Sequence, residues 1–156
     1  MTTTATRSSR THRAELDELD PTPWPLALLC GAVGGALALL AFPPYDLWML
    51  LPVALALLSV AVLTRSAWTA LLSSLAWGLA FFVPLTEWAN TYAGTMPWVA
   101  LGIVQALYIV LFGLLARTVM VRRGLTPSTL IVVSALWVAV ETFRSHVPWG
   151  GLPWGA

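Results

Sequence analysis

The chain has 156 residues, of which 58% are hydrophobic and 10% are charged, and its formal net charge is +1. Soluble domains carry about a quarter charged residues, so this composition excludes an ordinary soluble domain, and the absence of a basic stripe gives no reason to expect a nucleic-acid partner. The nine tryptophans are typical of chains that meet the membrane interface, where the indole ring is half dry and half hydrated. The sequence therefore predicts an all-α integral membrane protein.

The N-terminal segment, residues 1–23, is polar and contains first arginines and then a patch of acidic residues. Such a composition cannot form a core, so we predict a disordered tail. Basic residues before an apolar run also occur in signal peptides. Here four acidic residues separate the two, and more apolar runs follow. This order favours a retained first helix over a cleaved signal.

Five apolar runs follow the tail, and together they predict a partial multi-helix membrane domain over residues 24–156. A helix needs about 20 residues, with a range of about 17 to 25, to cross the hydrocarbon layer. Four runs fit this length, and the fifth is short. The runs are continuous rather than alternating, which argues against membrane strands. We predict transmembrane helices over about 24–41, 47–63, 67–85, 97–120 and 129–143.

The breaks between the runs have their own signals. Two prolines in the segment 42–46 cannot lie cheaply inside a helix, so they predict a short hairpin between the first two helices. Residues 64–66 form a second turn. Residues 87–97 are predicted as a polar, aromatic loop, and residues 117–127 as a basic loop that ends with Gly and Pro.

The distribution of arginines predicts the orientation, because cytoplasmic loops carry an excess of basic residues. With a cytoplasmic N-terminus, the tail, the 64–66 turn and the 117–127 loop lie inside, and five crossings place the C-terminus on the extracytoplasmic side. Only Arg144 then lies outside. The inside segments contain Arg7, Arg10, Arg13, Arg65, Arg117, Arg122 and Arg123.

The predicted outer face collects most of the polar and aromatic residues that could take part in chemistry. Glu141 and Arg144 are three positions apart, so on a helix they share a face and can pair. Such a pair either fixes the helix end or positions a substrate head group. His146 could act as a general base, but no nucleophile motif lies near it. The other residues gathered at this face are Tyr45, Asp46, Glu87, Trp88, Tyr92, Trp149 and Trp154.

The residue pattern contains no self-sufficient active site. There is no phosphate-binding glycine loop, no metal-ligand spacing and no cofactor motif, so no catalytic, metal or cofactor residue is assigned from it. The single Cys30 lies in an apolar run, where a small buried hydrophobe is the ordinary interpretation.

Three segments resemble one family, the bacterial apolipoprotein N-acyltransferases. LAFPPYDLW (40–48) resembles their first hairpin, and GLAFFVPLTEWANTYAG (78–94) resembles their third helix and the loop after it. ALWVAVETFRSHVPWGGLPWGA (135–156) resembles the Trp-x-x-x-Glu-x-x-Arg helix end and the Gly-aromatic-Pro-Trp-Gly motif of actinobacterial members. Leu152 stands where an aromatic residue is usual. The resemblance covers about residues 24–156.

The resemblance implies an acyltransferase of the bacterial inner membrane, in which eight helices carry a nitrilase-like domain with a Glu-Lys-Cys triad. Its acyl donor would be a membrane phospholipid, and its acceptor the α-amino group of a lipoprotein's diacylglyceryl-Cys. This chain has no Lys, and its only Cys is in the first run, so the resemblance predicts a chain truncated before the catalytic domain. The residues expected to support the substrate channel are Tyr45, Asp46, Glu87, Trp88, Glu141, Arg144, Pro153, Trp154 and Gly155.

Two other functions remain as alternatives. Some relatives of this domain are fused to, or partner with, a polyprenol-phosphate mannose synthase, so the chain could be a non-catalytic membrane anchor for that glycosyltransferase. A small transporter or channel subunit would place charges deep within the helices or show inverted repeats. The acidic residues instead cluster at one predicted face, which argues against a transmembrane path.

Overall fold

The computed structural model describes residues 22–64 and 66–147, and in these residues it contains helices and no strand. The predicted disordered tail lies almost wholly outside the described residues, as do Pro153, Trp154 and Gly155. The elements are α2 (Trp24–Leu40), the 3-10 helix η1 (Trp48–Leu50), α3 (Leu51–Val62), α4 (Ala67–Leu85), α5 (Trp88–Ala93), α6 (Thr95–Arg123) and α7 (Pro127–His146).

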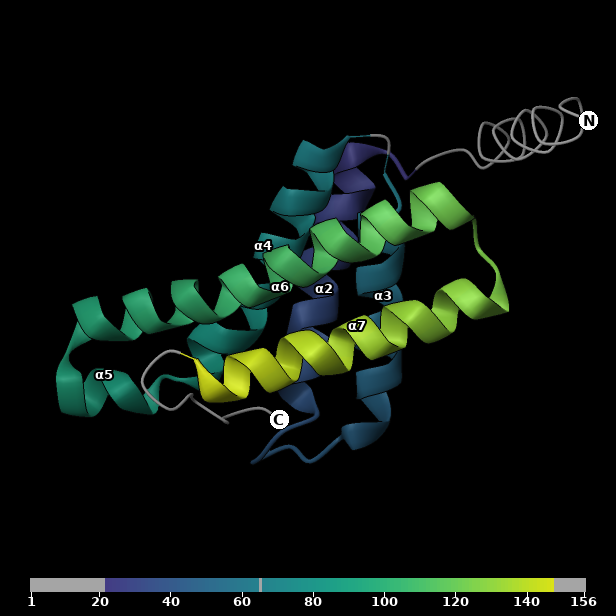
Figure 1. Ribbon diagram of the computed structural model, residues 1–156. Helices are drawn as coiled ribbons and strands as arrows, with labels where there is room; N and C mark the ends of the chain where they lie inside the picture. The colour runs from purple at the N-terminus through teal and green to yellow at the C-terminus, as the bar shows by residue number, and fades with distance from the viewer. Residues whose placement is uncertain (1–21, 65, 148–156) are drawn as a thin grey trace, which may run out of the picture.

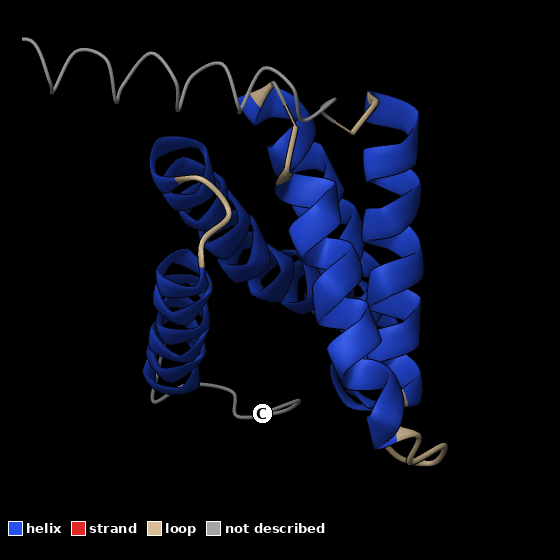
Figure 2. Cartoon of the chain, turned by 90° about the vertical axis from the view of Figure 1, so that its right-hand side faces the viewer, coloured by secondary structure: helices blue, strands red, loops and turns tan. Residues whose placement is uncertain are grey.

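The helices α2, α3 and α4 run side by side and form one layer (Figures 1 and 2). Glycines bring α2 close to α4, because a Cβ atom at Gly31 or Gly35 would collide with the carbonyl oxygen of Ser73 or Trp77. Without a hydrophobic drive between helices in lipid, such small residues allow close backbone packing. The Gly31–Gly35 pair thus fixes the spacing of this layer.

Helix α6 packs against the other side of α4, again through small residues. A Cβ at Gly78 would lie 2.7 Å from Ala106, and one at Gly113 would collide with the Ser74 hydroxyl. With 29 residues, α6 is about 44 Å long at about 1.5 Å per residue. That exceeds the roughly 30 Å hydrocarbon thickness, so a spanning α6 has to tilt. Figure 1 shows α6 crossing the α2–α4 layer at a steep angle.

Helix α7 runs antiparallel to α6 and packs chiefly against it (Figure 1). Thr126 caps its N-terminus by accepting a hydrogen bond from the Thr129 backbone N–H, at 3.2 Å. At the other end the Tyr108 hydroxyl donates to the carbonyl oxygen of Val147, at 2.9 Å. Large apolar side chains on the rest of α7 stay exposed, namely Leu130, Ile131, Val138 and Phe143.

Several local expectations were wrong. Residues 87–97 are not a loop throughout, because α5 occupies Trp88–Ala93 and α6 already begins at Thr95. Gly94 (φ 87°) forms the short break between the two helices. The second predicted run is divided, since Pro52 lies in the first turn of α3 and a 3-10 turn precedes it. The fifth run continues as helix to His146, so Glu141 lies more than a turn before the helix end.

Three described helices, α4, α6 and α7, are long and apolar enough to cross a membrane, and α2 and the η1–α3 segment are shorter apolar helices. Many of their large apolar side chains are exposed on the outer surface of the bundle. A soluble protein rarely exposes so much apolar surface, whereas lipid tails solvate it well. The all-helical, apolar character predicted from the composition is therefore confirmed.

Candidate functional site

A cavity of about 360 Å³ lies between α7 and the helices that it faces. Its volume falls within the range of roughly 300 to 1,000 Å³ that is usual for small-molecule sites. Residues from five helices or their connecting turns line it, and most of them are aromatic or aliphatic. The lining residues are Phe42, Leu51, Leu55, Trp77, Phe81, Phe82, Ile109, Trp137, Val138, Glu141, Thr142 and Ser145.

The inner wall of the cavity is a cluster of packed aromatic rings. Phe81 is the centre, with ring centroids 5.3 Å from Phe42, 5.4 Å from Trp77 and 4.6 Å from Phe82. Trp137 of α7 meets Trp77 edge-on at 6.2 Å. Tilted and edge-on pairs at these distances are the favoured aromatic geometries. The Trp77 indole N–H is used inside the fold, since it donates to the Ala54 carbonyl oxygen at 3.3 Å.

An ion pair lies at the polar edge of this cavity. The Arg144 guanidinium contacts the Glu141 carboxylate, with Nη2 to Oε2 at 2.7 Å and Nε to the two carboxylate oxygens at 3.3 and 3.2 Å. The Arg144 side chain is 0% exposed and Glu141 is 19% exposed. The guanidinium carbon also lies 5.2 Å from the centroid of the Phe82 ring, where a cation is attracted to the ring face. The pair expected from the sequence spacing is therefore present within α7, and the contact of Arg144 with Phe82 ties α7 to α4.

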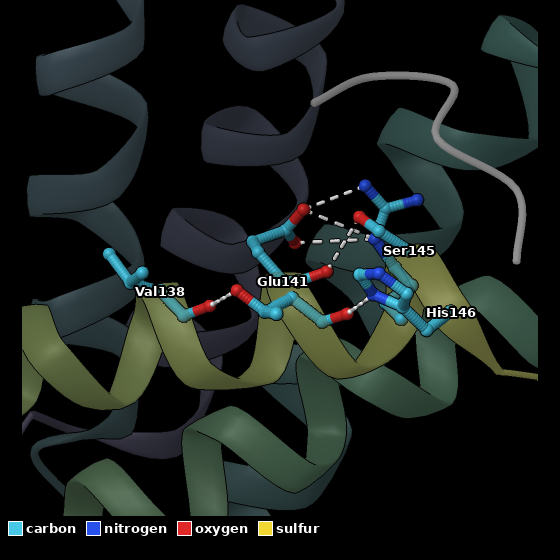
Figure 3. Close-up of polar contacts among 6 residues, drawn as sticks. Val138, Glu141, Ser145 and His146 are labelled. Carbon is cyan, nitrogen blue, oxygen red and sulfur yellow. Dashed lines mark hydrogen bonds and ion pairs between the residues drawn. The ribbon is translucent and has the colours of Figure 1, made fainter.

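The hydroxyl groups beside Glu141 donate hydrogen bonds to backbone carbonyl oxygens of α7 (Figure 3). Thr142 Oγ1 donates to the Val138 carbonyl oxygen at 2.7 Å, and Ser145 Oγ donates to the Glu141 carbonyl oxygen at 2.8 Å. His146 Nδ1 lies 2.7 Å from the Thr142 carbonyl oxygen, and its ring does not line the cavity. Among the described residues at this cavity, no nucleophile lies together with a general base.

The other predicted site residues that the structure describes do not line the cavity. Tyr45 and Asp46 are exposed in the α2–α3 turn, where Asp46 adopts a left-handed conformation with φ 55°. Glu87 and Trp88 are exposed around the start of α5. Figures 1 and 2 both show the α2–α3 turn and the end of α7 toward the same end of the molecule. The structure thus joins Glu141 to Arg144 but not to the other four residues.

The aromatic and aliphatic residues of the cavity were missed as site residues in the sequence. In the sequence, Trp77, Phe81 and Phe82 look like ordinary residues of an apolar helix, and Trp137 is only one residue of a motif. No periodicity distinguishes a residue that lines a hollow from one that fills a core. In the part of the chain that the structure describes, no three His, Cys, Asp or Glu side chains gather into a possible metal site.

Comparison with known proteins decides the family. The family model described as the apolipoprotein N-acyltransferase N-terminal domain matches residues 34–156. The chain belongs to the apolipoprotein N-acyltransferase family. All three resembling segments, 40–48, 78–94 and 135–156, lie inside the matched region, so the resemblance is confirmed at the level of the family.

Individual apolipoprotein N-acyltransferases are similar over most of this chain. The protein of that name from Mycolicibacterium smegmatis is 42% identical over 124 residues, which cover 77% of this chain and 20% of the relative. The one from Chromobacterium violaceum is 35% identical over 139 residues, or 84% of this chain and 27% of the relative. The chain therefore spans about a fifth to a quarter of the length of these relatives. No solved structure matches it.

Proposed function

We propose that this chain is the membrane domain of an enzyme that transfers an acyl chain from phospholipid to the α-amino group of a lipoprotein's N-terminal diacylglyceryl-Cys. The observation that carries the proposal is the family match over residues 34–156, on a bundle that contains an apolar cavity with one polar edge. A phospholipid donor and a lipidated acceptor both bring acyl chains into the membrane. A cavity of this lining can receive such a chain.

The catalytic groups of the reaction are proposed to lie outside these residues. The chain has no Lys, and Cys30 is partly buried within α2, among apolar neighbours in sequence. A thiol acts as a nucleophile when a nearby cation or base favours its thiolate, and an apolar helix gives no such help. The role of the chain is then to hold the enzyme in the bilayer and to position its lipid substrates.

We further propose a multi-pass arrangement in the bacterial inner membrane, with five crossings and a cytoplasmic N-terminus. Exposed tryptophans support this arrangement because they occur at both ends of the α2–α4 layer. Trp24 and Trp68 begin α2 and α4 at one end, and Trp48 and Trp88 lie in η1 and α5 toward the other. Tryptophan is enriched at both membrane interfaces. The basic Arg122 and Arg123 lie at the end of α6, which the positive-inside rule assigns to the cytoplasm.

Around the cavity, the exposed residues of the turns are proposed to form the edge of the substrate channel. Glu141 and Arg144 would support its floor, because Glu141 holds the Arg144 guanidinium, which contacts the Phe82 ring of α4. The alternative function is an anchor for a mannose synthase. The relatives are named as apolipoprotein N-acyltransferases, and their names do not support this alternative. The remaining channel residues of this proposal are Tyr45, Asp46, Glu87, Trp88, Pro153, Trp154 and Gly155.

A chimera tests the proposal. The aligned part of the Mycolicibacterium smegmatis relative is replaced by residues 24–156 of this chain, and the chimera is expressed in cells that lack their own enzyme. We expect lipoproteins to gain the mass of one acyl chain at the N-terminus, as measured by mass spectrometry. In the same chimera, Trp154→Ala should lose acyl transfer while membrane insertion persists.

The control is a chimera whose exposed Ile131 is changed to Ala, away from the cavity, which should keep its activity. A chimera that inserts into the membrane at normal levels but leaves lipoproteins unacylated would contradict the proposed function. Full activity of the Trp154→Ala chimera would remove Trp154 from the channel and leave the family role intact.

A further inference from the structure

The end of α6 carries two arginines whose charged groups are not used to hold the fold together. Arg122 and Arg123 lie in the last turn of α6, and both are exposed. Neither side chain forms a hydrogen bond or an ion pair with any residue that the structure describes. Arg117 differs from them, because its Nε donates to the Thr64 carbonyl oxygen at 3.1 Å and ties α6 to the α3–α4 turn. The two terminal arginines can therefore serve a partner outside the chain.

The acidic residues that the structure describes all lie away from this end of the bundle. Asp46 follows α2 and Glu87 follows α4, at the end of the layer where α6 begins. Glu141 lies about 21 Å along α7 from its first residue, Pro127, at about 1.5 Å per residue. The helix dipole places about half a negative charge at the C-terminus of α6, which two guanidinium groups exceed. Among the described residues, this end is therefore positively charged.

Exposed apolar side chains flank the two arginines. Val121 precedes them on α6, and Leu125 follows them in the short connection to α7 (Figure 1). The surface of a soluble acidic partner would leave these apolar groups unmatched, whereas acyl chains solvate them. The aliphatic stem of an arginine can run along apolar surface while its charged head reaches the level of the phosphates. The sequence of apolar, cationic and apolar groups thus suits the boundary between acyl chains and lipid head groups.

We propose that this basic end, formed by Val121, Arg122, Arg123 and Leu125, binds the head group of an anionic phospholipid. A guanidinium group is planar and can donate two parallel hydrogen bonds to one phosphate. The phosphate of a zwitterionic lipid is balanced by that lipid's own cation, so the net charge selects an anionic lipid.

The lipid bound here differs from the acyl donor of the proposed function in its place. In the membrane arrangement proposed above, the basic end lies at the cytoplasmic interface, where the leaflet carries anionic lipids. The polar edge of the cavity, at Glu141, lies toward the other end of α7. A lipid at the basic end therefore fixes the α6–α7 connection in the bilayer and is not consumed.

The test compares the two ends of α6 within one molecule. A fluorophore is attached to Ser128→Cys, next to the basic end, or to Thr91→Cys in α5 near the start of α6, each in a Cys30→Ala background. The full chain is placed in phosphatidylcholine nanodiscs that contain a small fraction of nitroxide-labelled phosphatidylglycerol or nitroxide-labelled phosphatidylcholine. At residue 128 we expect the anionic lipid to quench at least about fivefold more, which is the factor for one arginine at an anionic surface. At residue 91 the ratio should be about one or lower.

Two double variants separate charge from hydrogen-bond geometry. Arg122→Gln/Arg123→Gln should bring the quenching ratio at residue 128 to near one. Arg122→Lys/Arg123→Lys keeps the net charge but loses the planar fork, so its ratio should lie between those of the native chain and the Gln variant. A salt titration of the native chain needs no variant. Raising the ionic strength from about 0.01 M to about 1 M shortens the Debye length from about 30 Å to about 3 Å and should remove most of the preference.

Equal quenching of residue 128 by both lipids would overturn the inference. So would a preference that persists in the Gln variant, or one that appears only after the four acidic residues of segment 15–20 are neutralised, because that segment would then occupy the arginines of the native chain. Inorganic phosphate, added at constant ionic strength, should leave the preference unchanged. Its loss would mean that the arginines bind free phosphate rather than a lipid.

The quenching readout is independent of acyl transfer and of which end of the chain faces the cytoplasm, since both leaflets of the nanodisc have the same composition. An active chimera whose ratio at residue 128 is near one would reject the lipid site and keep the proposed function. A clear preference in a chain whose chimera is inactive would keep the lipid site and reject the proposed function.

Discussion

The packing of α4 against α2 and α6 differs from the packing at the junction with α7. Around α4, small residues bring backbones into direct contact, as at Gly35 against Trp77 and Gly78 against Ala106. At the α7 junction, large rings and the contact of Arg144 with Phe82 bridge wider distances, as at Trp137 against Phe112 with centroids 5.0 Å apart. The cavity lies beside α7, where the side chains of α7 and of the helices that it faces do not fill the space between them.

The difference shows how one apolar chain builds both a scaffold and a site. Close packing leaves no space for a ligand, because any added atom collides with a neighbouring backbone. Aromatic side chains of irregular shape leave hollows where only some of them meet. The elements that bind ligands are usually drawn from the less tightly packed part of a fold. We expect α7 to be the helix whose exchange and stability respond first to changes at the site.

The largest effect is expected from Arg144→Met, which removes the buried cation and leaves the Glu141 carboxylate without its partner. Breaking a buried pair on one side costs about 3 to 5 kcal/mol, and the 19% exposure of Glu141 places the value near 3. Hydrogen exchange in detergent micelles should show faster exchange over α7 and little change over α2–α4.

The double variant Glu141→Gln/Arg144→Met removes both charges and serves as the control. It should recover part of the stability, because no unpaired carboxylate remains. If the single variant loosened α2 and α4 as much as α7, the contrast between scaffold and junction would be wrong.

Gly35→Val should disturb the close packing of α2 against α4. Its Cβ would collide with the Trp77 carbonyl oxygen, a backbone atom that cannot move aside, so α2 and α4 must separate. Overpacking of this kind costs about 1 to 3 kcal/mol, and occasionally more. The loss should appear as a lower midpoint of thermal unfolding for the whole bundle. Ala36→Val, at an exposed position on the same helix, should leave the midpoint unchanged.

Much of the fold could be predicted from hydrophobic runs and their breaks. The prolines after Phe42 end α2, and Pro84 lies one residue before the end of α4, where a helix is expected to stop. Short helices are harder to predict. The segment 88–93 is polar and aromatic like a loop, and its helical turn depends on packing against α6 rather than on its own pattern. The tilt of α6 and α7 is likewise a packing result.

The candidate site could be predicted only in its polar part. The three-residue spacing of Glu141 and Arg144 was sufficient to predict their pairing, because it follows from helix geometry alone. The cavity could not be predicted, since it depends on how the rings of the α2–α3 turn, α4 and α7 are placed in space. Tyr45 and Glu87 were grouped with Glu141 by their predicted side of the membrane. Sharing an end of the molecule does not bring side chains into contact.

Substitutions at the N-caps of α7 and α4 compare the same two regions of the molecule, with a smaller expected effect. Thr126→Ala removes the cap of α7, and Ser66→Ala removes the side-chain acceptor for the Trp68 N–H at the start of α4. Losing an N-cap costs about 1 kcal/mol. In the loosely held α7 the loss should accelerate exchange across the first turns, whereas in α4 neighbouring helices on both sides should confine it to residues near the cap. Equal spread in both helices would contradict the contrast.

The smallest effect is expected from Tyr108→Phe, which removes the hydrogen bond from the Tyr108 hydroxyl to the Val147 carbonyl oxygen. The ring contact with Phe143, at a centroid distance of 5.9 Å, would remain. An exposed hydrogen bond contributes about 0.5 kcal/mol, at the low end of the usual range, so global unfolding should hardly change. Because the bond fixes the residue directly after α7, exchange of the last turn, including the amides of Arg144 and Ser145, should still rise about twofold. That local rise without a global change is the behaviour of a helix held at a few points, and its absence would mean that the aromatic contacts alone hold the end of α7.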